Sequence, residues 1–161
     1  ARIAFLNSLS IDGVAILAPF FWNFPQKDLI TYYQGLADSS NAPICLYDLP
    51  QVTGTKLEME TFHELAKHPN IAGAKVSCDF SFTRNLIDEM PDDFRIIVAQ
   101  PYLVDVLLHH GVKEHLDGMW SIVPKWTVGI CDSASSGEWK ASMYTVPPSS
   151  SRDGDASETA M

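Results

Sequence analysis

Two residues that can do chemistry together, a tyrosine and a lysine, lie near the ends of two short apolar runs. Tyr47 closes the run Pro43-Ile-Cys-Leu-Tyr47, and Lys75 lies near the end of Ile71-Ala-Gly-Ala-Lys75-Val76. Burial of an ammonium group is costly and favours the neutral amine. A neutral lysine attacks ketones and aldehydes to form a Schiff base, and a neighbouring phenol can relay protons. The pair therefore predicts imine chemistry.

The spacing alone also allows a second interpretation, and it supports this interpretation at least as well as it supports imine chemistry. The Lys75 amine can extend to solvent from a strand end, and Tyr47 can simply cover the core. Neither role requires catalysis.

The segment between the two runs has a helical pattern. Leu57, Phe62, Leu65 and Ala66 recur at roughly helical spacing. A strand, a helix and a strand in this order form a βαβ unit, whose strands are parallel. Parallel strands end at the same edge of a sheet, where α/β folds carry their functional groups. This arrangement predicts that the tyrosine and the lysine are neighbours.

The same alternation continues along the chain. Strands are predicted near positions 14, 44, 72, 95 and 118, the last being Asp117–Ser121, and helices after Pro25, near Glu58–His68, after Ser81 as N-cap, after Pro101 and after Pro124. This order predicts a parallel α/β sheet, either open and doubly wound or part of an eightfold barrel. No glycine-rich phosphate-binding turn follows a strand, which argues against an open nucleotide-binding domain.

Four short stretches carry a resemblance to a known family. Tyr47-Asp-Leu-Pro50-Gln-Val-Thr53-Gly54 and the following Gly73-Ala-Lys75 resemble the dihydrodipicolinate synthase and N-acetylneuraminate lyase family of Schiff-base class I aldolases. Ala18-Pro19-Phe20-Phe21 and His68-Pro69-Asn70-Ile71-Ala72-Gly73 are also similar to family elements, so the likeness extends from about Gly13 to Ala141. The resemblance implies that Lys75 forms the Schiff base with pyruvate or a related 2-oxo acid and that Tyr47 relays protons.

The resemblance also implies the architecture. It favours the (β/α)8 TIM barrel and matches the five predicted strands to the family's fourth to eighth. A closed barrel of this type has about 250 residues, whereas this chain has 161. We therefore expect an incomplete barrel over residues 1–141. Residues 142–161, rich in Ser, Pro, Asp and Gly, are predicted to be a disordered, low-complexity tail.

Four further residues are candidates for substrate binding. The resemblance places Thr53 and Gly54 in the family's loop after the tyrosine strand, where they could shape the pocket; a plain turn is an equally good interpretation. Ser77 and Ser121 lie at or beyond strand ends and could donate hydrogen bonds to a carboxylate or hydroxyl, although ordinary polar strand ends explain them somewhat better.

Three departures from the family pattern bear on the substrate, on the proton relay and on the charge of Lys75. Val52 stands where the synthases carry an arginine for the second substrate's carboxylate, which argues against lysine biosynthesis. Phe21 lacks the hydroxyl of the family's tyrosine at that position, so one member of the proton relay is lost. Asp48 replaces the usual asparagine, and its charge would keep Lys75 protonated if the two lay close together.

Composition excludes several classes of partner. The net charge of −9 and the absence of a basic stripe exclude nucleic acid, and the longest apolar stretch, Val14–Trp22, is too short for a membrane span. The three cysteines form no CxxC motif, which favours a reducing, cytoplasmic compartment, and the five histidines are not spaced as metal ligands. We expect no metal and no cofactor.

The first hypothesis is thus a lyase or aldolase that makes or cleaves a C–C bond through an imine at Lys75. Its substrate would be a small 2-oxo acid, and it would act as a homo-oligomer. The alternative is a catalytically inactive barrel fragment that serves as a binding or oligomerisation module. The predicted absence of three strands favours the alternative, whereas the Tyr47/Lys75 pair favours catalysis.

Overall fold

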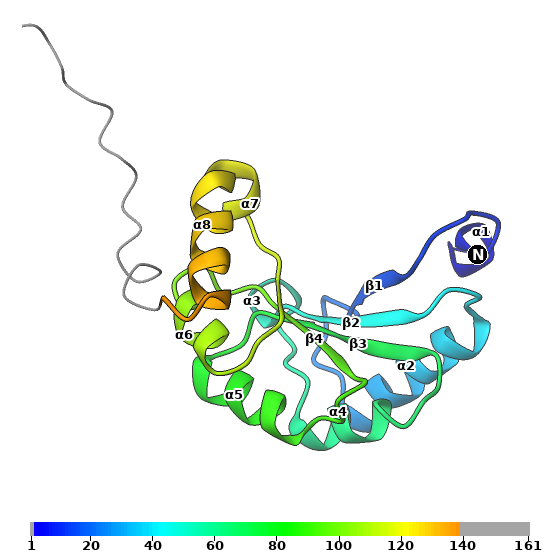
Figure 1. Cartoon of the computed structure of the whole chain (residues 1–161). Coiled ribbons are helices and arrows are strands. Elements are labelled where there is room, and N and C mark those ends of the chain that lie inside the picture. The colour runs from blue at the N-terminus through cyan, green and yellow to red at the C-terminus, as the bar shows by residue number, and fades with distance from the viewer. Residues whose placement is uncertain (1, 139–161) are drawn as a thin grey trace, which may run out of the picture.

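Five parallel strands form one sheet in the computed structural model, which describes residues 2–138 (Figure 1). The strands are β1 (Val14–Leu17), β2 (Ile44–Asp48), β3 (Ile71–Val76), β4 (Arg95–Val98) and β5 (Glu114–His115), and they lie side by side in chain order. The tail predicted over residues 142–161 lies outside the described residues, so the boundary after residue 141 stays a prediction.

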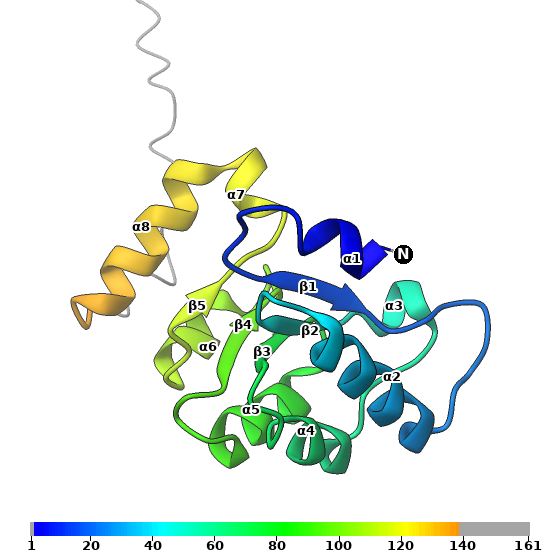
Figure 2. The same ribbon diagram turned by 90° about the vertical axis from the view of Figure 1, so that its right-hand side faces the viewer.

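The helices lie mainly on one face of this sheet. They are α1 (Arg2–Leu6), α2 (Gln26–Ser39), α3 (Pro50–Thr53), α4 (Met59–Leu65), α5 (Phe80–Glu89), α6 (Val104–His109), α7 (Met119–Ile122) and α8 (Pro124–Ser135). Helices α2, α4 and α5 cover the same face, while α1 lies near the β1 side of the sheet and α7 and α8 near the β5 side (Figures 1 and 2). An open doubly wound sheet has helices on both faces and a reversal in strand order. Chain order with helices on one face is the pattern of a barrel wall.

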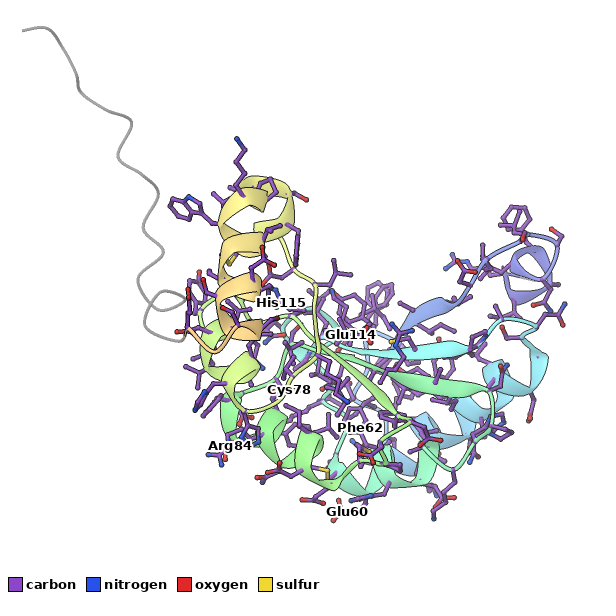
Figure 3. The ribbon with its side chains drawn as sticks, in the orientation of Figure 1. Glu60, Phe62, Cys78, Arg84, Glu114 and His115 are labelled. Carbon is purple, nitrogen blue, oxygen red and sulfur yellow. The ribbon has the colours of Figure 1, made fainter. Side chains whose placement is uncertain are left out.

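Alternating burial separates the two faces of the sheet. In β2, Ile44 and Leu46 are fully buried, whereas Cys45 and Tyr47 are only partly buried. Successive side chains of a strand point to opposite faces, so the buried set contacts the helices. The core against that face includes Leu29, Tyr33, Phe62, Leu65, Leu86 and Leu107. Phe62 is labelled in Figure 3. Each such side chain contributes about 1.5–3 kcal/mol by leaving water. The opposite face of the sheet stays accessible.

An irregularity in β3 sets the register of the sheet. Ile44 is opposite Ile71, but the next residue of β2, Cys45, is opposite Gly73, so β3 contains one extra residue, Ala72. Without this bulge, Tyr47 would be opposite Ala74. A slip of one residue turns every side chain to the other face. The bulge therefore brings the lysine of β3 opposite the tyrosine of β2.

Gly73 allows β3 and β4 to approach closely at this bulge. A Cβ atom on Gly73 would lie 2.1 Å from the carbonyl oxygen of Arg95, which is backbone and cannot rotate away. We expect Gly73→Ala to lower the free energy of unfolding by at least about 2 kcal/mol, measured by urea denaturation. The matched control is Gly35→Ala in α2, where an added Cβ meets nothing within 4 Å. That variant should gain about 0.5–1 kcal/mol. Equal midpoints for Gly73→Ala and the parent would contradict the close approach.

The predicted fifth strand, Asp117–Ser121, is wrong. The strand is β5, Glu114–His115, and residues Met119–Ile122 form helix α7 instead. The Asp117 carboxylate accepts a hydrogen bond from the backbone N–H of Met119 at 2.7 Å. Such a local bond to an aspartate competes with extended structure and starts a turn. The sequence 117–121 therefore leaves the sheet.

The N-cap predicted for α5, Ser81, is also wrong, although the helix is confirmed. Asp79 is the N-cap, and its carboxylate accepts from the backbone N–H of Phe82 at 2.9 Å. Ser81 lies inside the first turn. The helices predicted after Pro25 and Pro124 are confirmed as α2 and α8, whereas the one predicted to begin at Pro101 begins at Val104.

Asp79 and Ser81 provide a direct test of the cap. Asp79→Ala removes the side-chain acceptor at this helix start and should cost about 1 kcal/mol of stability in urea denaturation. Ser81→Ala should change stability by less than about 0.5 kcal/mol, because the serine is inside the helix. Asp79→Asn keeps the cap and loses only the exposed ion pair with Lys56, at 2.9 Å, which contributes little. A larger loss for Ser81→Ala than for Asp79→Ala would contradict the cap.

Candidate active site

The structure brings Tyr47 and Lys75 into direct contact on the accessible face of the sheet. The two residues are opposite each other in the β2–β3 register. The Lys75 Nζ donates a hydrogen bond to the Tyr47 hydroxyl at 2.6 Å and lies 3.9 Å from the centroid of its ring. Both side chains are partly buried. A contact of this length allows a proton to pass between amine and phenol.

Apolar side chains flank the pair on the same face. Leu17 of β1 is opposite Tyr47, and Ile97 of β4 is opposite Lys75. The same row ends at Glu114 of β5, opposite Ile97, so it crosses all five strands. The sequence prediction did not single out Leu17 and Ile97. Their place depends on the strand register, which the hydrophobic pattern alone does not specify. The two apolar side chains lie on either side of the pair, next to the amine that would act as the nucleophile.

Thr53 and Gly54 lie in the turn that follows β2. Gly54 adopts a left-handed conformation (φ 73°), and its N–H bonds to the carbonyl of Pro50 at 2.9 Å, ending α3. The buried Thr53 hydroxyl lies 2.9 Å from the carbonyl oxygen of Thr55 and 3.2 Å from that of Leu49. These bonds fix the loop from within. The structure thus shows a well-determined turn next to the pair, with the threonine engaged by its own loop.

The two candidate serines are placed differently. Ser77 follows Lys75 by two residues at the carboxyl end of β3, and its backbone N–H bonds to the Asp48 carbonyl at 3.0 Å. Within residues 2–138 its hydroxyl makes no hydrogen bond. Ser121 is exposed on α7, and within residues 2–138 its side chain makes no hydrogen bond to either member of the pair. Ser77 is therefore near the pair, whereas Ser121 is on a separate helix.

Asp48 faces away from Lys75. It follows Tyr47 in β2, so its side chain points to the helix-covered face, where it is 1% exposed. Its carboxylate accepts from the backbone N–H of Leu57 at 3.1 Å and from the Cys78 thiol. Burial raises the pKa of Asp48, while these two hydrogen bonds oppose the rise. The expectation that this charge acts on Lys75 depended on proximity, and the structure places the carboxylate on the other face.

The buried charge predicts a pH-dependent stability. Because the pKa of Asp48 is raised by burial in the folded state, ionisation opposes folding at neutral pH, and the cost disappears as pH falls through the folded-state pKa. Asp48→Asn should therefore be more stable than the parent in urea at pH 7, with the difference shrinking toward pH 4. Asp12→Asn, at an exposed position, is the control and should show no such trend. A difference that grows on acidification would contradict the sign.

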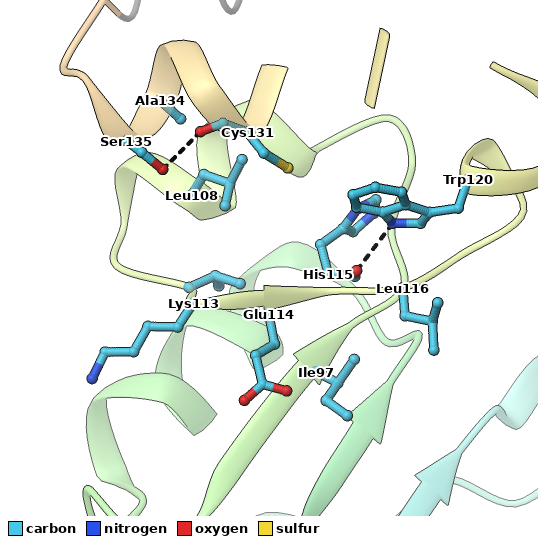
Figure 4. A pocket seen from close by; sticks show the side chains of 11 residues that line it. Ile97, Leu108, Lys113, Glu114, His115, Leu116, Trp120, Cys131, Ala134 and Ser135 are labelled. Atoms are coloured by element: carbon cyan, nitrogen blue, oxygen red, sulfur yellow. Dashed lines mark hydrogen bonds between the residues drawn. The ribbon is translucent and has the colours of Figure 1, made fainter. Parts of the chain in front are cut away.

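A cavity of about 770 Å³ lies at a different place, beside β5 and α8 (Figure 4). It is lined by Ile97, Leu108, Val112, Lys113, Glu114, His115, Leu116, Trp120, Cys131, Ala134 and Ser135. Among the described strands, β5 is the last of the sheet and pairs with β4, so the cavity lies along this end of the sheet. It shares Ile97 and Glu114 with the row that holds the pair, but neither Tyr47 nor Lys75 lines it. We place the chemistry at the Lys75 amine and the Tyr47 hydroxyl, which are in contact, and not in this cavity.

Other kinds of site receive no support from the described residues. Between residues 2 and 138, no three His, Cys, Asp or Glu side chains are grouped as metal ligands. In the same part of the chain, every helix is too short or too polar to cross a membrane.

Fold and site together define a class of protein: a parallel (β/α)8-type sheet with helices on one face and a lysine near the carboxyl end of a strand. Within that class, the model of the Dihydrodipicolinate synthetase family matches residues 4–145. The chain belongs to this family. The match confirms the family to which the motifs around Tyr47 and Lys75 pointed.

Curated and solved relatives agree with this assignment. A 4-hydroxy-tetrahydrodipicolinate synthase of Streptococcus mutans is 34% identical over 110 residues, which cover 68% of this chain and 36% of the relative. A dihydrodipicolinate synthase of Acinetobacter baumannii, solved with pyruvate, superposes with a TM-score of 0.80 at 23% identity, over 88% of this chain and 49% of that one. A catalytic lysine mutant of a Ruminococcus gnavus sialic acid aldolase superposes with a TM-score of 0.80 at 17% identity, over 86% of this chain and 46% of that one.

The solved relatives establish the fold. They confirm the incomplete (β/α)8 barrel of the α/β class that the resemblance implied. This chain spans 36% of the S. mutans synthase and just under half of each solved relative, so it corresponds to part of their length.

Proposed function

We propose that the protein is a class I aldolase or lyase in which Lys75 forms a Schiff base with pyruvate or a related 2-oxo acid. The observation that carries this proposal is the 2.6 Å contact between the Lys75 amine and the Tyr47 hydroxyl on the accessible face of the sheet. A lysine beside a phenol, flanked by apolar side chains, combines a nucleophile with a proton relay.

The reaction follows from these two groups. The Lys75 amine attacks the carbonyl carbon of the 2-oxo acid, and loss of water gives an iminium ion. The C–C bond two carbons away breaks, and its electron pair moves toward the iminium nitrogen to form an enamine. Tyr47, which has given its proton to the departing water, takes the proton of the hydroxyl on the outer carbon of the breaking bond, and the fragment that bears this carbon leaves as an aldehyde. The enamine is then protonated on carbon, and water releases the 2-oxo acid and the free amine.

The relatives support the 2-oxo acid as substrate. One solved relative is a synthase complexed with pyruvate, and others are aldolases for sialic acid and for 2-keto-3-deoxygluconate. In our proposal Ser77 donates a hydrogen bond to the substrate's carboxylate or hydroxyl, and the turn at Thr53 and Gly54 shapes the pocket. The exposed Val52 on α3 lacks the charge needed to bind an acidic second substrate.

The test is release of pyruvate from a panel of 2-oxo-3-deoxy sugar acids, followed with lactate dehydrogenase and NADH. We expect release from at least one member of the panel. Folded protein that releases none would favour the alternative, a catalytically inactive barrel module. The observation that favours this alternative is that the match covers only 36% of the S. mutans synthase.

A further inference from the structure

Buried polar groups connect the carboxyl ends of β2, β3 and β4 on the helix-covered face. Asp48, Cys78, Gln100 and Thr83 are all less than 10% exposed, and we call these four residues the buried polar chain. Cys78 is labelled in Figure 3, between the strand ends and the helical layer. Polar groups in a core are costly unless each has a partner, so their placement requires a physical reason.

Each member of the buried polar chain has a partner. Asp48 Oδ1 accepts from the backbone N–H of Leu57 at 3.1 Å, and Oδ2 accepts from the Cys78 thiol. Gln100 Nε2 donates to the Cys78 carbonyl and to the Thr83 hydroxyl, the latter at 2.7 Å. Burial raises the pKa of the Cys78 thiol, and the nearby Asp48 carboxylate raises it further, so sulfur is the donor. The series runs from the loop after β2, across the end of β3, to the residues after β4 and into α5.

The carboxylate in this series lies one residue from both reacting groups. Asp48 follows Tyr47 in β2, and it is opposite Val76, which follows Lys75 in β3. Its main chain is joined to the same strand end, since Ser77 N–H bonds to the Asp48 carbonyl at 3.0 Å. At the carboxyl end of β2, Tyr47 therefore points to the accessible face, and Asp48 points to the helix-covered face, where it contacts the loops after β2 and β3.

We propose that Asp48 is a positioning residue that holds the loops after β2 and β3 against the strand ends and so keeps the Tyr47 hydroxyl in contact with the Lys75 amine. This inference rests on the proposed function for its consequence in catalysis, but the contact itself can be measured without turnover.

The Asp48 carboxylate is not held by an ordinary ion pair. Lys56 is the cation that lowers its pKa, as the smallest of the influences on that pKa, and the Lys56 amine is hydrogen-bonded to Asp79 at 2.9 Å. The carboxylate is instead held by a backbone N–H and a thiol. An alanine at this position would leave the buried N–H of Leu57 without its acceptor, and that loss would release the loop. An asparagine retains one acceptor oxygen for the same N–H.

The experiment compares Asp48→Ala, Asp48→Asn and Cys78→Ala with the parent in the full chain. The first readout is hydrogen exchange of the Leu57 amide by NMR. The second is reductive methylation of Lys75 with formaldehyde and cyanoborohydride, measured by peptide mass spectrometry as a ratio to the exposed Lys125. The third is trapping of a pyruvate imine at Lys75 with borohydride.

We expect Asp48→Ala to lose at least tenfold in Leu57 protection, to change the Lys75/Lys125 ratio at least threefold and to trap pyruvate at least tenfold more slowly. Asp48→Asn should stay within twofold of the parent on all three readouts. Cys78→Ala should shift the ratio in the same direction as Asp48→Ala, and it decides the matter if the alanine variant does not fold. An unchanged Lys75/Lys125 ratio in folded Asp48→Ala would overturn the inference. If Asp48→Ala does not fold, an unchanged ratio in folded Cys78→Ala would overturn it.

The readouts separate this inference from the proposed function. A parent that traps no pyruvate, but whose Lys75 ratio and Leu57 protection respond to Asp48→Ala and are retained in Asp48→Asn, would support the positioning role and refute the aldolase. A parent that traps pyruvate at the same rate as a folded Asp48→Ala variant would refute the positioning role and support the aldolase.

Discussion

Lys75→Ala should lower the rate of pyruvate release by at least about 10³-fold and eliminate borohydride trapping, because no other described amine contacts the Tyr47 hydroxyl. The lysine is the electron sink of the proposed reaction. Without its imine, the C–C bond has no route by which its electron pair can be stabilised. The measurement is coupled pyruvate release at saturating substrate, with circular dichroism to show that the variant is folded.

Two controls define this result. Lys75→Arg introduces a guanidinium group, which is always charged and is not a nucleophilic amine, so it should be as inactive as the alanine variant. Lys113→Ala removes a lysine that lines the cavity beside β5, and it should retain full activity. Activity in Lys75→Arg would mean that the lysine supplies only charge. Loss in Lys113→Ala would move the chemistry to the cavity.

Tyr47→Phe should lower the rate about 10²–10⁴-fold while the protein stays folded. The ring that lies 3.9 Å from the Lys75 amine is kept, and only the hydroxyl that accepts its hydrogen bond at 2.6 Å is removed. The variant therefore lacks the group that takes the proton of the substrate hydroxyl in the proposed reaction. Imine formation at Lys75 should still occur, more slowly, so trapping with borohydride persists while pyruvate release falls.

Tyr33→Phe is the matched control for a lost phenol. The Tyr33 hydroxyl bonds to the carbonyl of Ile16 at 3.3 Å on the helix-covered face, and its side chain is fully buried. This variant should lose about 1 kcal/mol of stability and keep its activity. An equal loss of activity in both variants would show that the hydroxyl of Tyr47 acts through the fold and not as a proton relay.

The sequence predicted the parallel sheet and its reacting pair, but not the detail that aligns them. Apolar runs and one helical pattern were enough to place Tyr47 and Lys75 at neighbouring strand ends. The bulge at Ala72, which shifts the register by one residue, depends on backbone contacts between strands. Gly73 was recognised only as part of a family motif, and its close approach to Arg95 required coordinates.

The errors have a common cause, which is local competition for backbone hydrogen bonds. Asp117 binds the N–H of Met119 and turns a segment that looked extended into the start of α7. Asp79, not Ser81, caps α5 because its carboxylate reaches the N–H of Phe82. The role of Asp48 could not be predicted because its partners, Leu57 and Cys78, are 9 and 30 residues away along the chain.

The most direct test of the central claim is reduction with borohydride in the presence of pyruvate, followed by intact and peptide mass spectrometry. The account predicts one pyruvyl adduct, on the peptide that contains Lys75, and none without pyruvate. No adduct on folded protein, or an adduct on a different lysine, would contradict the assignment of Lys75 as the Schiff-base residue.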